Sequence, residues 1–310
     1  MATTTSITTT YAGEFKQQII SAALLSGNTI ANGGVTVKPN IKYKEIVKKL
    51  AIGAMSANAT CDFTAASSVT LTERVITPEE FQINLQLCKK DFRSDFEAIS
   101  MGISVYDNLP KNFQDYLVAE IAAKVAQENE ISLWRGANAT AGQYDGFVTL
   151  ATADATVVDV VGTTVTAANV IAELGKVVDA IPAALYGSAG LNVYVSQNVA
   201  RAYIRALGGF GASGLGANGT NAMGTQWSNN GSLSFDGVPI FVANGLASNY
   251  IMAGEKENLW FGTGLLNDST EVKVIDMADL DGSQNVRVVM RYTAAAQYGI
   301  GSELVLYTPV

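Results

Sequence analysis

The sequence predicts an α+β fold, in which helices and mainly antiparallel strands occupy different stretches of the chain. Residues 112–134 carry apolar side chains every four positions, which is typical of a long amphipathic helix. Residues 80–88 alternate strictly between apolar and polar side chains, which is typical of a half-exposed strand. From residue 249 onward, the chain consists of short apolar runs separated by turn residues. These three observations define the fold class.

The first part of the chain predicts an arm followed by a short helix. Six of the first ten residues are threonine, a composition typical of a disordered arm. This stretch has neither a basic region nor an apolar core, so we expect no secretory signal. No apolar run approaches the roughly 20 residues of a membrane span, so we expect no membrane contact. Residues 13–25 place apolar side chains at helical spacing, and the Asn-Gly-Gly at 32–34 ends this region.

Residues 38–50 concentrate positive charge in a chain whose net charge is −8. Beside a single glutamate, Glu45, this stretch has five lysines: Lys38, Lys42, Lys44, Lys48 and Lys49. Their alternation with apolar residues predicts an exposed strand. Two interpretations are open. The lysines either solvate a strand edge and discourage unwanted pairing, or they form a contact patch for an acidic neighbouring subunit.

Two further strands are expected after this lysine-rich stretch, at 68–76 and 80–88. In the second, Phe81 and three aliphatic residues form one face, and amides and a cysteine form the other. We therefore interpret 38–90 as a long antiparallel excursion from the body of the protein. Such an excursion is marginally stable alone and needs a neighbour on which to pack.

The strongest helix prediction in the chain follows. Pro110 suits a first turn, and Phe113, Leu117, Ile121 and Val125 recur every four residues on one face. Residues 112–134 would span roughly 34 Å at 1.5 Å per residue, which suits a structural spine.

The middle of the chain predicts alternating helices and strands. Residues 145–150 resemble a turn and strand, and Thr166 is a candidate cap for a helix that ends before Pro182. A buried strand is expected at 191–196, where Ser196 then caps a helix that reaches Leu207. A β-hairpin with an Asp-Gly turn is expected at 232–243. Five more strands follow, at 249–254, 257–262, 271–277, 285–299 and 303–308.

The glycines at 208–219 form a G-x-G-x-x-G motif, made by Gly209, Gly211 and Gly214, with Asp236 downstream. A dinucleotide-binding loop requires a strand directly before this motif and a helix directly after it. Here the preceding segment predicts a helix, the following segment predicts none, and Asp236 belongs to a hairpin turn. We therefore interpret the stretch as a mobile loop and expect no cofactor there.

The composition excludes most enzyme classes. The chain has no histidine, which removes the usual general base and nearly every zinc site, and its two cysteines have no metal or redox spacing. Asp276, Asp279 and Asp281 most simply solvate a loop, with metal binding as the alternative. Charged residues make up only 15% of the chain, which indicates a surface covered by further copies of the chain, unless it is a monomer rich in small residues. The net negative charge argues against sequence-independent nucleic-acid binding.

The order of these elements resembles the major capsid proteins of tailed bacteriophages with the HK97-type fold. The resemblance covers essentially the whole chain. It is carried by "VKPNIKYKEIVKKL" to "EFQINLQLCKKDF", by "NFQDYLVAEIAAKVAQENEISLWRG", and by "FDGVPIFVANGL" followed by "NVRVVMRYTAAAQYGIGSELVLY". It implies an N-terminal arm and short helix (1–37), an extended β-hairpin loop (38–92), a peripheral domain (93–155 and 270–310) with spine helix 110–135, and an axial domain (156–269) with glycine-rich loop 208–231.

This resemblance implies a non-enzymatic shell protein, without catalytic residues, cofactor or metal. It would assemble with itself into pentamers and hexamers of an icosahedral shell that encloses double-stranded DNA in a virion built in the host cytoplasm. A portal protein, a separate scaffolding protein and a decoration protein are the other partners that it implies. The implied inter-subunit contacts are Lys38, Lys42, Lys44, Lys48, Lys49, Phe81, Gly209, Gly211 and Gly214. Some members crosslink a loop lysine to a neighbour's asparagine, but the residues give no specific pair here.

Three other functions are compatible with the sequence. An encapsulin-like bacterial nanocompartment would share the fold and enclose cargo protein instead of DNA. A nucleotide-binding enzyme would use the glycine-rich loop. A carbohydrate-binding or adhesive β-domain would use the Thr/Asn/Gly-rich surface.

Overall fold

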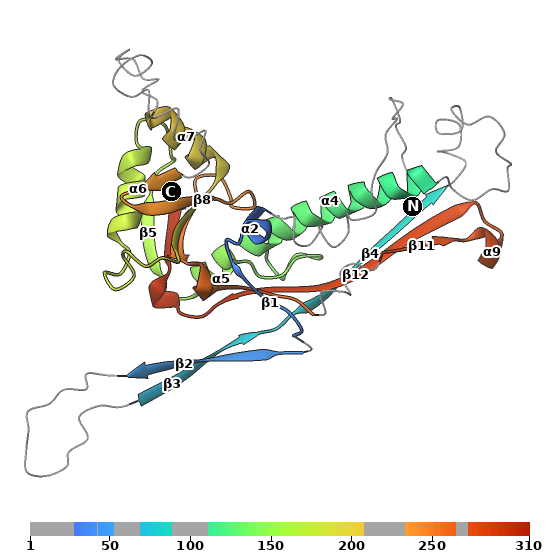
Figure 1. Ribbon diagram of the computed structural model, residues 1–310, viewed down its shortest axis with the longest axis horizontal. Coiled ribbons are helices and arrows are strands. Elements are labelled where there is room, and N and C mark those ends of the chain that lie inside the picture. The colour runs from blue at the N-terminus through green and yellow to red at the C-terminus, as the bar shows by residue number, and fades with distance from the viewer. Residues whose placement is uncertain (1–27, 42, 53–68, 89–110, 208–232, 265–271) are drawn as a thin grey trace, which may run out of the picture.

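The computed structural model describes residues 28–41, 43–52, 69–88, 111–207, 233–264 and 272–310. Within these residues, the chain forms two β-sheets that meet at a shared core, a long helix that lies along one of them, and a two-stranded hairpin that projects away (Figure 1). The mixture of helices and mainly antiparallel strands confirms the predicted α+β class.

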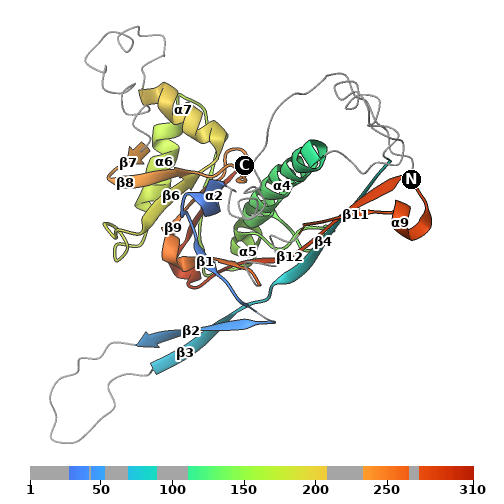
Figure 2. The same ribbon diagram turned by 45° about the vertical axis from the view of Figure 1, so that its right-hand side comes forward.

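The first sheet has five strands in the order β1 (Thr36–Lys38), β10 (Leu259–Gly262), β12 (Asn285–Tyr298) and β11 (Val272–Asp276), with β4 (Glu79–Cys88) also paired to β12. β12 is antiparallel to β4 over ten residue pairs, from Asn285 opposite Cys88 to Ala294 opposite Glu79. The short helix α9 (Ala278–Asp281) connects β11 to β12. The long helix α4 (Lys111–Arg135) lies along this sheet in both views (Figure 2).

The second sheet has six strands in the order β5 (Val158–Gly162), β13 (Val305–Pro309), β9 (Ile251–Glu255), β6 (Leu191–Val195), β8 (Val238–Val242) and β7 (Leu233–Phe235). Helices α6 (Val170–Asp179) and α7 (Gln197–Leu207) pack against it and share one apolar cluster with its strands. At the turn between β7 and β8, Asp236 and Gly237 have positive φ values of 46° and 79°, as the predicted Asp-Gly hairpin requires.

A second apolar cluster joins the two sheets. Trp134 at the end of α4 is fully buried, and its ring lies 5.2 Å from Tyr194 of β6 and 5.5 Å from Phe147 of α5 (Phe147–Ala153). Gly245 packs so closely on this end of α4 that a Cβ atom there would overlap the Glu130 carbonyl oxygen. The helix and the six-stranded part are therefore held as one packed unit.

The base of the N-terminal segment joins the same region through a buried carboxylate. In α2 (Asn28–Ala31), the Thr29 backbone N–H donates to Glu130 Oε2 at 3.1 Å, and the Thr29 hydroxyl donates to Glu130 Oε1. The Trp134 Nε1–H donates to the same hydroxyl at 2.8 Å. Both Glu130 carboxyl oxygens thus accept from Thr29, and these buried hydrogen bonds hold α2 on α4.

Most elements expected from the sequence are present. The predictions are confirmed for the long helix, for strands β3 (Val69–Ile76), β4 and β6, for helix α7 and for the closing strands. The helix expected at 13–25 lies outside the described residues. Two local predictions are wrong.

The first of these is the turn and strand expected at 145–150, which is helix α5 instead. Phe147 and Ala151 are both fully buried four residues apart, so tertiary packing of one helical face overrides the strand preference of Phe, Val and Thr. The second is the Thr166 cap. Helix α6 begins later, after Asn169, whose side-chain oxygen accepts from the Thr166 backbone N–H at 2.7 Å.

The predicted excursion 38–90 also needs correction. Only β2 (Glu45–Ile52) and β3 form the projecting hairpin, whereas β4 turns away and pairs with β12. The strand pairing also does not follow the expected boundary between residues 269 and 270, which separates the axial domain from the second part of the peripheral domain. β10 joins the five-stranded sheet, and β13 joins the six-stranded one. The pairing partner of a short apolar run depends on residues far away in the sequence, so its periodicity could not identify the sheet.

Candidate assembly interface at the β2–β3 hairpin

The β2–β3 hairpin has two unlike faces, because residues paired across its strands point to the same side. The inner face carries Val47 opposite Arg74 and Glu45 opposite Ile76. Ile76 is 1% exposed and packs with Ile41 and Ala295 against the body of the protein. The inner face is therefore an intramolecular contact.

The outer face of the hairpin carries apolar side chains that nothing in the described part of the chain covers. Ile46 is 53% exposed, Leu71 is 59% exposed and Val69 is 64% exposed. Between them, Lys48 lies directly opposite Glu73 across the two strands. An apolar stripe on a projecting hairpin is unusual for a monomer and typical of a surface that another protein covers.

One ion pair clamps the hairpin to the body. Arg74 of β3 forms a salt bridge with Asp154, which follows α5, and its guanidinium lies 5.0 Å from the centre of the Tyr298 ring. The Tyr298 hydroxyl donates to Asp154 Oδ2 at 2.9 Å, and the Thr156 backbone N–H donates to Oδ1 at 3.0 Å. Arg74 thus connects β3 to the end of β12 and to the loop after α5. We name Arg74, Asp154 and Tyr298 the hairpin clamp.

The surroundings of the hairpin clamp fix the protonation states of Asp154 and Tyr298. Burial alone would raise the pKa of Asp154, but hydrogen bonds from Thr156, Arg74 and Tyr298 outweigh it and hold that pKa well below its usual range. Burial and the nearby Asp154 carboxylate raise the pKa of Tyr298, so its phenol keeps the proton that it donates. The carboxylate is therefore charged and the phenol is neutral at ordinary pH.

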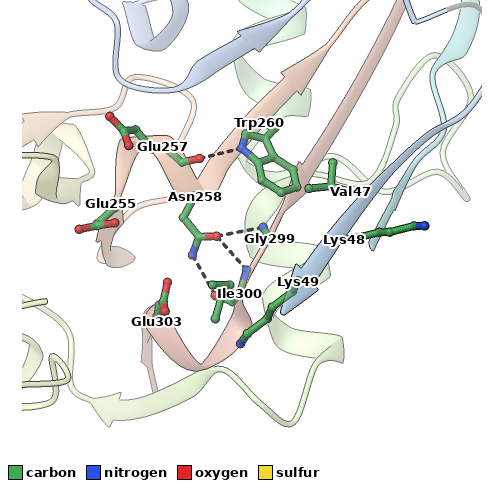
Figure 3. A pocket seen from close by; sticks show the side chains of 10 residues that line it. All are labelled: Val47, Lys48, Lys49, Glu255, Glu257, Asn258, Trp260, Gly299, Ile300 and Glu303. Atoms are coloured by element: carbon green, nitrogen blue, oxygen red, sulfur yellow. Dashed lines mark hydrogen bonds between the residues drawn. The ribbon is translucent and has the colours of Figure 1, made fainter. Parts of the chain in front are cut away.

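A cavity of about 340 Å³ lies between strand β2 and the body (Figure 3). Lys49 reaches toward it from the hairpin, and Glu303 and Trp260 line it from the body. Burial raises the pKa of Glu303, the Lys49 charge opposes this rise, and Glu255 adds to it. Asn258 also lines the cavity. Its side-chain oxygen accepts hydrogen bonds from the Gly299 and Ile300 backbone N–H groups at 3.0 and 2.8 Å.

The structure disperses the lysines that the sequence grouped together. Lys38 makes a 3.1 Å salt bridge with Glu45 and lies 4.3 Å from the centre of the Trp260 ring. Lys44 and Lys48 are exposed, whereas Lys49 is half-buried at the cavity. Lys42 lies outside the described residues. The four described lysines therefore do not form one patch, and the exposed lysines and the apolar stripe share the hairpin region.

Phe81 lies within the fold. Its ring packs 5.4 Å from Tyr292 and 5.9 Å from Tyr144, beneath the end of α4. The exposed apolar stripe, in contrast, was missed as a candidate site. The alternation of Val69, Leu71 and Val75 was visible in the sequence, but which face met the body was not.

The glycine-rich motif of Gly209, Gly211 and Gly214 lies outside the described residues. Helix α7 ends at Leu207 directly before it, so a helix and not a strand precedes the motif, as predicted. Among the described residues, no cluster of three or more His, Cys, Asp or Glu side chains could hold a metal ion. No helix in the described ranges is long and apolar enough to cross a membrane.

We expect that replacing Arg74 with alanine loosens the hairpin, because the change leaves the Asp154 carboxylate half-buried without its cation. Arg74 is partly exposed, so the loss of unfolding free energy should be modest, about 1 kcal/mol. Backbone amides of β3 should exchange hydrogen roughly fivefold faster, the factor that about 1 kcal/mol produces in an opening equilibrium, measured by mass spectrometry. Lys48→Ala, on the same hairpin but facing outward, is the matched control. Equal exchange in both variants would contradict the clamp.

The depressed pKa of Asp154 predicts a specific pH dependence. A carboxyl whose pKa is lower in the folded than in the unfolded state stabilises the fold above its unfolded pKa, and this stabilisation is lost as pH falls through the folded value. The difference in melting temperature between the native chain and Asp154→Asn should therefore be constant from about pH 8 to 5 and shrink below about pH 4. A difference that instead grows on acidification would overturn this assignment.

Comparison with known proteins finds a similarity in fold but none in sequence. No protein-family model matches the chain, and no curated protein matches its sequence. Solved structures do match. The capsid of a native GTA particle aligns with a TM-score of 0.61 at 13% identity, covering 99% of this chain and 95% of that one.

Two further structures align over nearly their full length. The capsid of Myoviridae phage XM1 gives a TM-score of 0.58 at 13% identity, covering 96% of this chain and 95% of the other. A virus-like particle from Pyrococcus furiosus gives 0.52 at 9% identity, covering 94% and 96%. At such low identity the likeness establishes the fold, and the chain has the HK97-type capsid fold that its sequence predicted.

Proposed function

We propose that this chain is a major capsid protein of a tailed bacteriophage, which assembles into pentamers and hexamers of an icosahedral shell that encloses double-stranded DNA. One observation carries the proposal. The fold match to the GTA and XM1 capsids extends over almost the whole length of both chains in each comparison. The low proportion of charged residues, 15%, is consistent with a surface that further copies cover.

The hairpin is the part of the molecule that most needs a partner. An isolated two-stranded hairpin is marginally stable in water, and this one turns its apolar outer face away from the body. In an assembly, the stripe of Ile46, Val69 and Leu71 would lie on a neighbouring subunit, with Lys48 among these residues and Lys44 just before the strand. Three of the predicted contact residues already have contacts within the chain: Lys38, Lys49 and Phe81. They would contribute to the interface indirectly, by holding the hairpin and the neighbouring strands in place.

The other predicted partners belong to the same proposal. A portal protein, a separate scaffolding protein and a decoration protein would complete a virion assembled in the host cytoplasm. The glycine-rich loop, with Gly209, Gly211 and Gly214, would lie near the centre of each capsomer, where one sequence must suit five-fold and six-fold neighbours. Lys42 would join the hairpin contacts. The role is structural and not enzymatic.

An encapsulin-like nanocompartment is the second candidate, because the virus-like particle from Pyrococcus furiosus shares the fold. The phage function is favoured because the capsids compared above align with higher TM-scores. The two candidates differ in content. Particles that protect DNA from nuclease would support the phage function, and particles that carry protein cargo would support the nanocompartment.

The first test is expression of the full chain, alone and with a candidate scaffolding protein, followed by electron microscopy. We expect closed shells tens of nanometres across, or free rings of five and six subunits. A dispersed monomer in both preparations, even at high concentration, would rule out a shell function of either kind.

A second test addresses the outer face of the hairpin. Leu71→Asp places a charge in the exposed stripe, so we expect the chain to fold normally and to fail to form shells. Leu280→Asp is the matched control, since Leu280 is 71% exposed on α9, far from the hairpin. Shells from Leu71→Asp with native yield would show that the stripe is not an interface. Circular dichroism of both variants checks the fold.

A further inference from the structure

The six-stranded part of the molecule has two sides of opposite charge. Its sheet begins with β5 and ends with β7, so these two strands are its edges. Helix α6 covers the β5 end, and α7 covers the β7 end, where Tyr203 lies 5.9 Å from Phe235 and its hydroxyl donates to the Ser234 carbonyl at 2.8 Å. In Figure 1, α6 and β5 lie on one side of this part, and α7 lies at its top.

The α7 side is basic. Val199, Ala200 and Tyr203 are buried against the sheet, and the opposite face of the helix exposes Arg201 and Arg205, which are four residues apart. Neither arginine makes an ion pair with any residue in the described part of the chain. Arg201 makes one long contact, of 3.5 Å, with Gln197 Oε1. Two guanidinium groups are therefore available on one row of this helix.

The β5–α6 side is acidic and apolar. Asp159 of β5 and Asp179 at the end of α6 are exposed, and neither makes an ion pair within the described ranges. Glu173 in the first turn of α6 accepts a hydrogen bond from Thr163 just after β5. Because α6 also packs on β5, the helix runs back along the strand and brings Asp179 toward the end that carries Asp159. Val161 (64% exposed) and Ile171 (52% exposed) add apolar surface beside them.

We infer that these two sides meet between copies of the chain, so that the β5–α6 side of one copy docks on the α7 side of the next. The inference deepens the proposed shell function and rests on it. Two different surfaces on one chain make a head-to-tail contact, which closes into a ring when the rotation permits. Charge complementarity selects the partner: two unpaired carboxylates with apolar neighbours on one side match two unpaired guanidinium groups on the other. A second copy of the chain carries both of these surfaces.

Charge reversal tests this contact. The α7-reversed chain carries Arg201→Glu and Arg205→Glu, and the edge-reversed chain carries Asp159→Lys and Asp179→Lys. In either chain alone, every ring contact would place like charges together, so the concentration needed for assembly should rise by at least about tenfold. A chain with all four changes has opposite charges at each contact again and should assemble like the native chain.

A mixture of the two reversed chains gives a sharper result. If they alternate around a ring, each contact pairs opposite charges, but alternation is possible only in rings with an even number of subunits. We therefore expect an equal mixture to recover six-membered rings and open sheets or tubes, while five-membered rings and closed shells stay absent in electron micrographs. Recovery of hexamers without pentamers would identify a head-to-tail contact through these two faces.

Controls separate the possible failures. Arg201→Gln with Arg205→Gln removes charge without reversing it and should weaken assembly less than the α7-reversed chain does. Thermal melts confirm that each exposed substitution leaves the fold intact. If the native chain forms shells and both reversed chains also do so at native concentrations, the contact inferred here is wrong and the shell function stands. If the native chain itself forms neither rings nor shells, the proposed function fails.

Discussion

The pairing of strand β12 is the constraint on which the rest of the structure depends. Its 14 residues pair with β4, β11 and β10, and they support α4 through Val288 and Met290. Three successive alanines, 294–296, place only small side chains in the last third of the strand, where the two sheets and the hairpin base converge. The strand ends at Tyr298, which belongs to the hairpin clamp. A shift of one residue in its register would reverse every side chain and disrupt the helix, the sheet and the clamp together.

This arrangement explains how a projecting hairpin can have a defined direction. The strands β2 and β3 have no further strand partner among the described residues, so their orientation depends on the contacts at their base. Ile76 supplies apolar packing there, and Arg74 supplies a directional ion pair to a carboxylate that is charged throughout the ordinary pH range. A rigid base with an apolar outer face suits a surface that must meet a neighbour in a fixed orientation.

The candidate interface could be predicted from the sequence only in part. The lysine-rich stretch lies in the same hairpin region as the exposed apolar stripe. That a two-stranded hairpin needs a neighbour followed from general physical principles. The lysines themselves turned out to have separate roles, since Lys38 bonds Glu45 and Lys49 borders a cavity. The clamp was not predictable, because Arg74, Asp154 and Tyr298 are 80 and 144 residues apart and no local pattern links them. The opposite charges of α7 and of the β5–α6 side could not be predicted either. They depend on which side chains the folded chain exposes together, and a linear segment does not show this.

The sequence by itself determined the local elements and, through their order, the fold class. Period-four apolar spacing produced α4, strict alternation produced β4, and Asp236-Gly237 produced the hairpin turn, because each of these depends on neighbours a few residues away. Tertiary structure alone decided that β4 leaves the hairpin for β12, that β13 joins the six-stranded sheet, and that 147–153 is helical. The reason is physical: a short apolar segment can satisfy its hydrogen bonds in several ways, and burial against distant residues selects one of them.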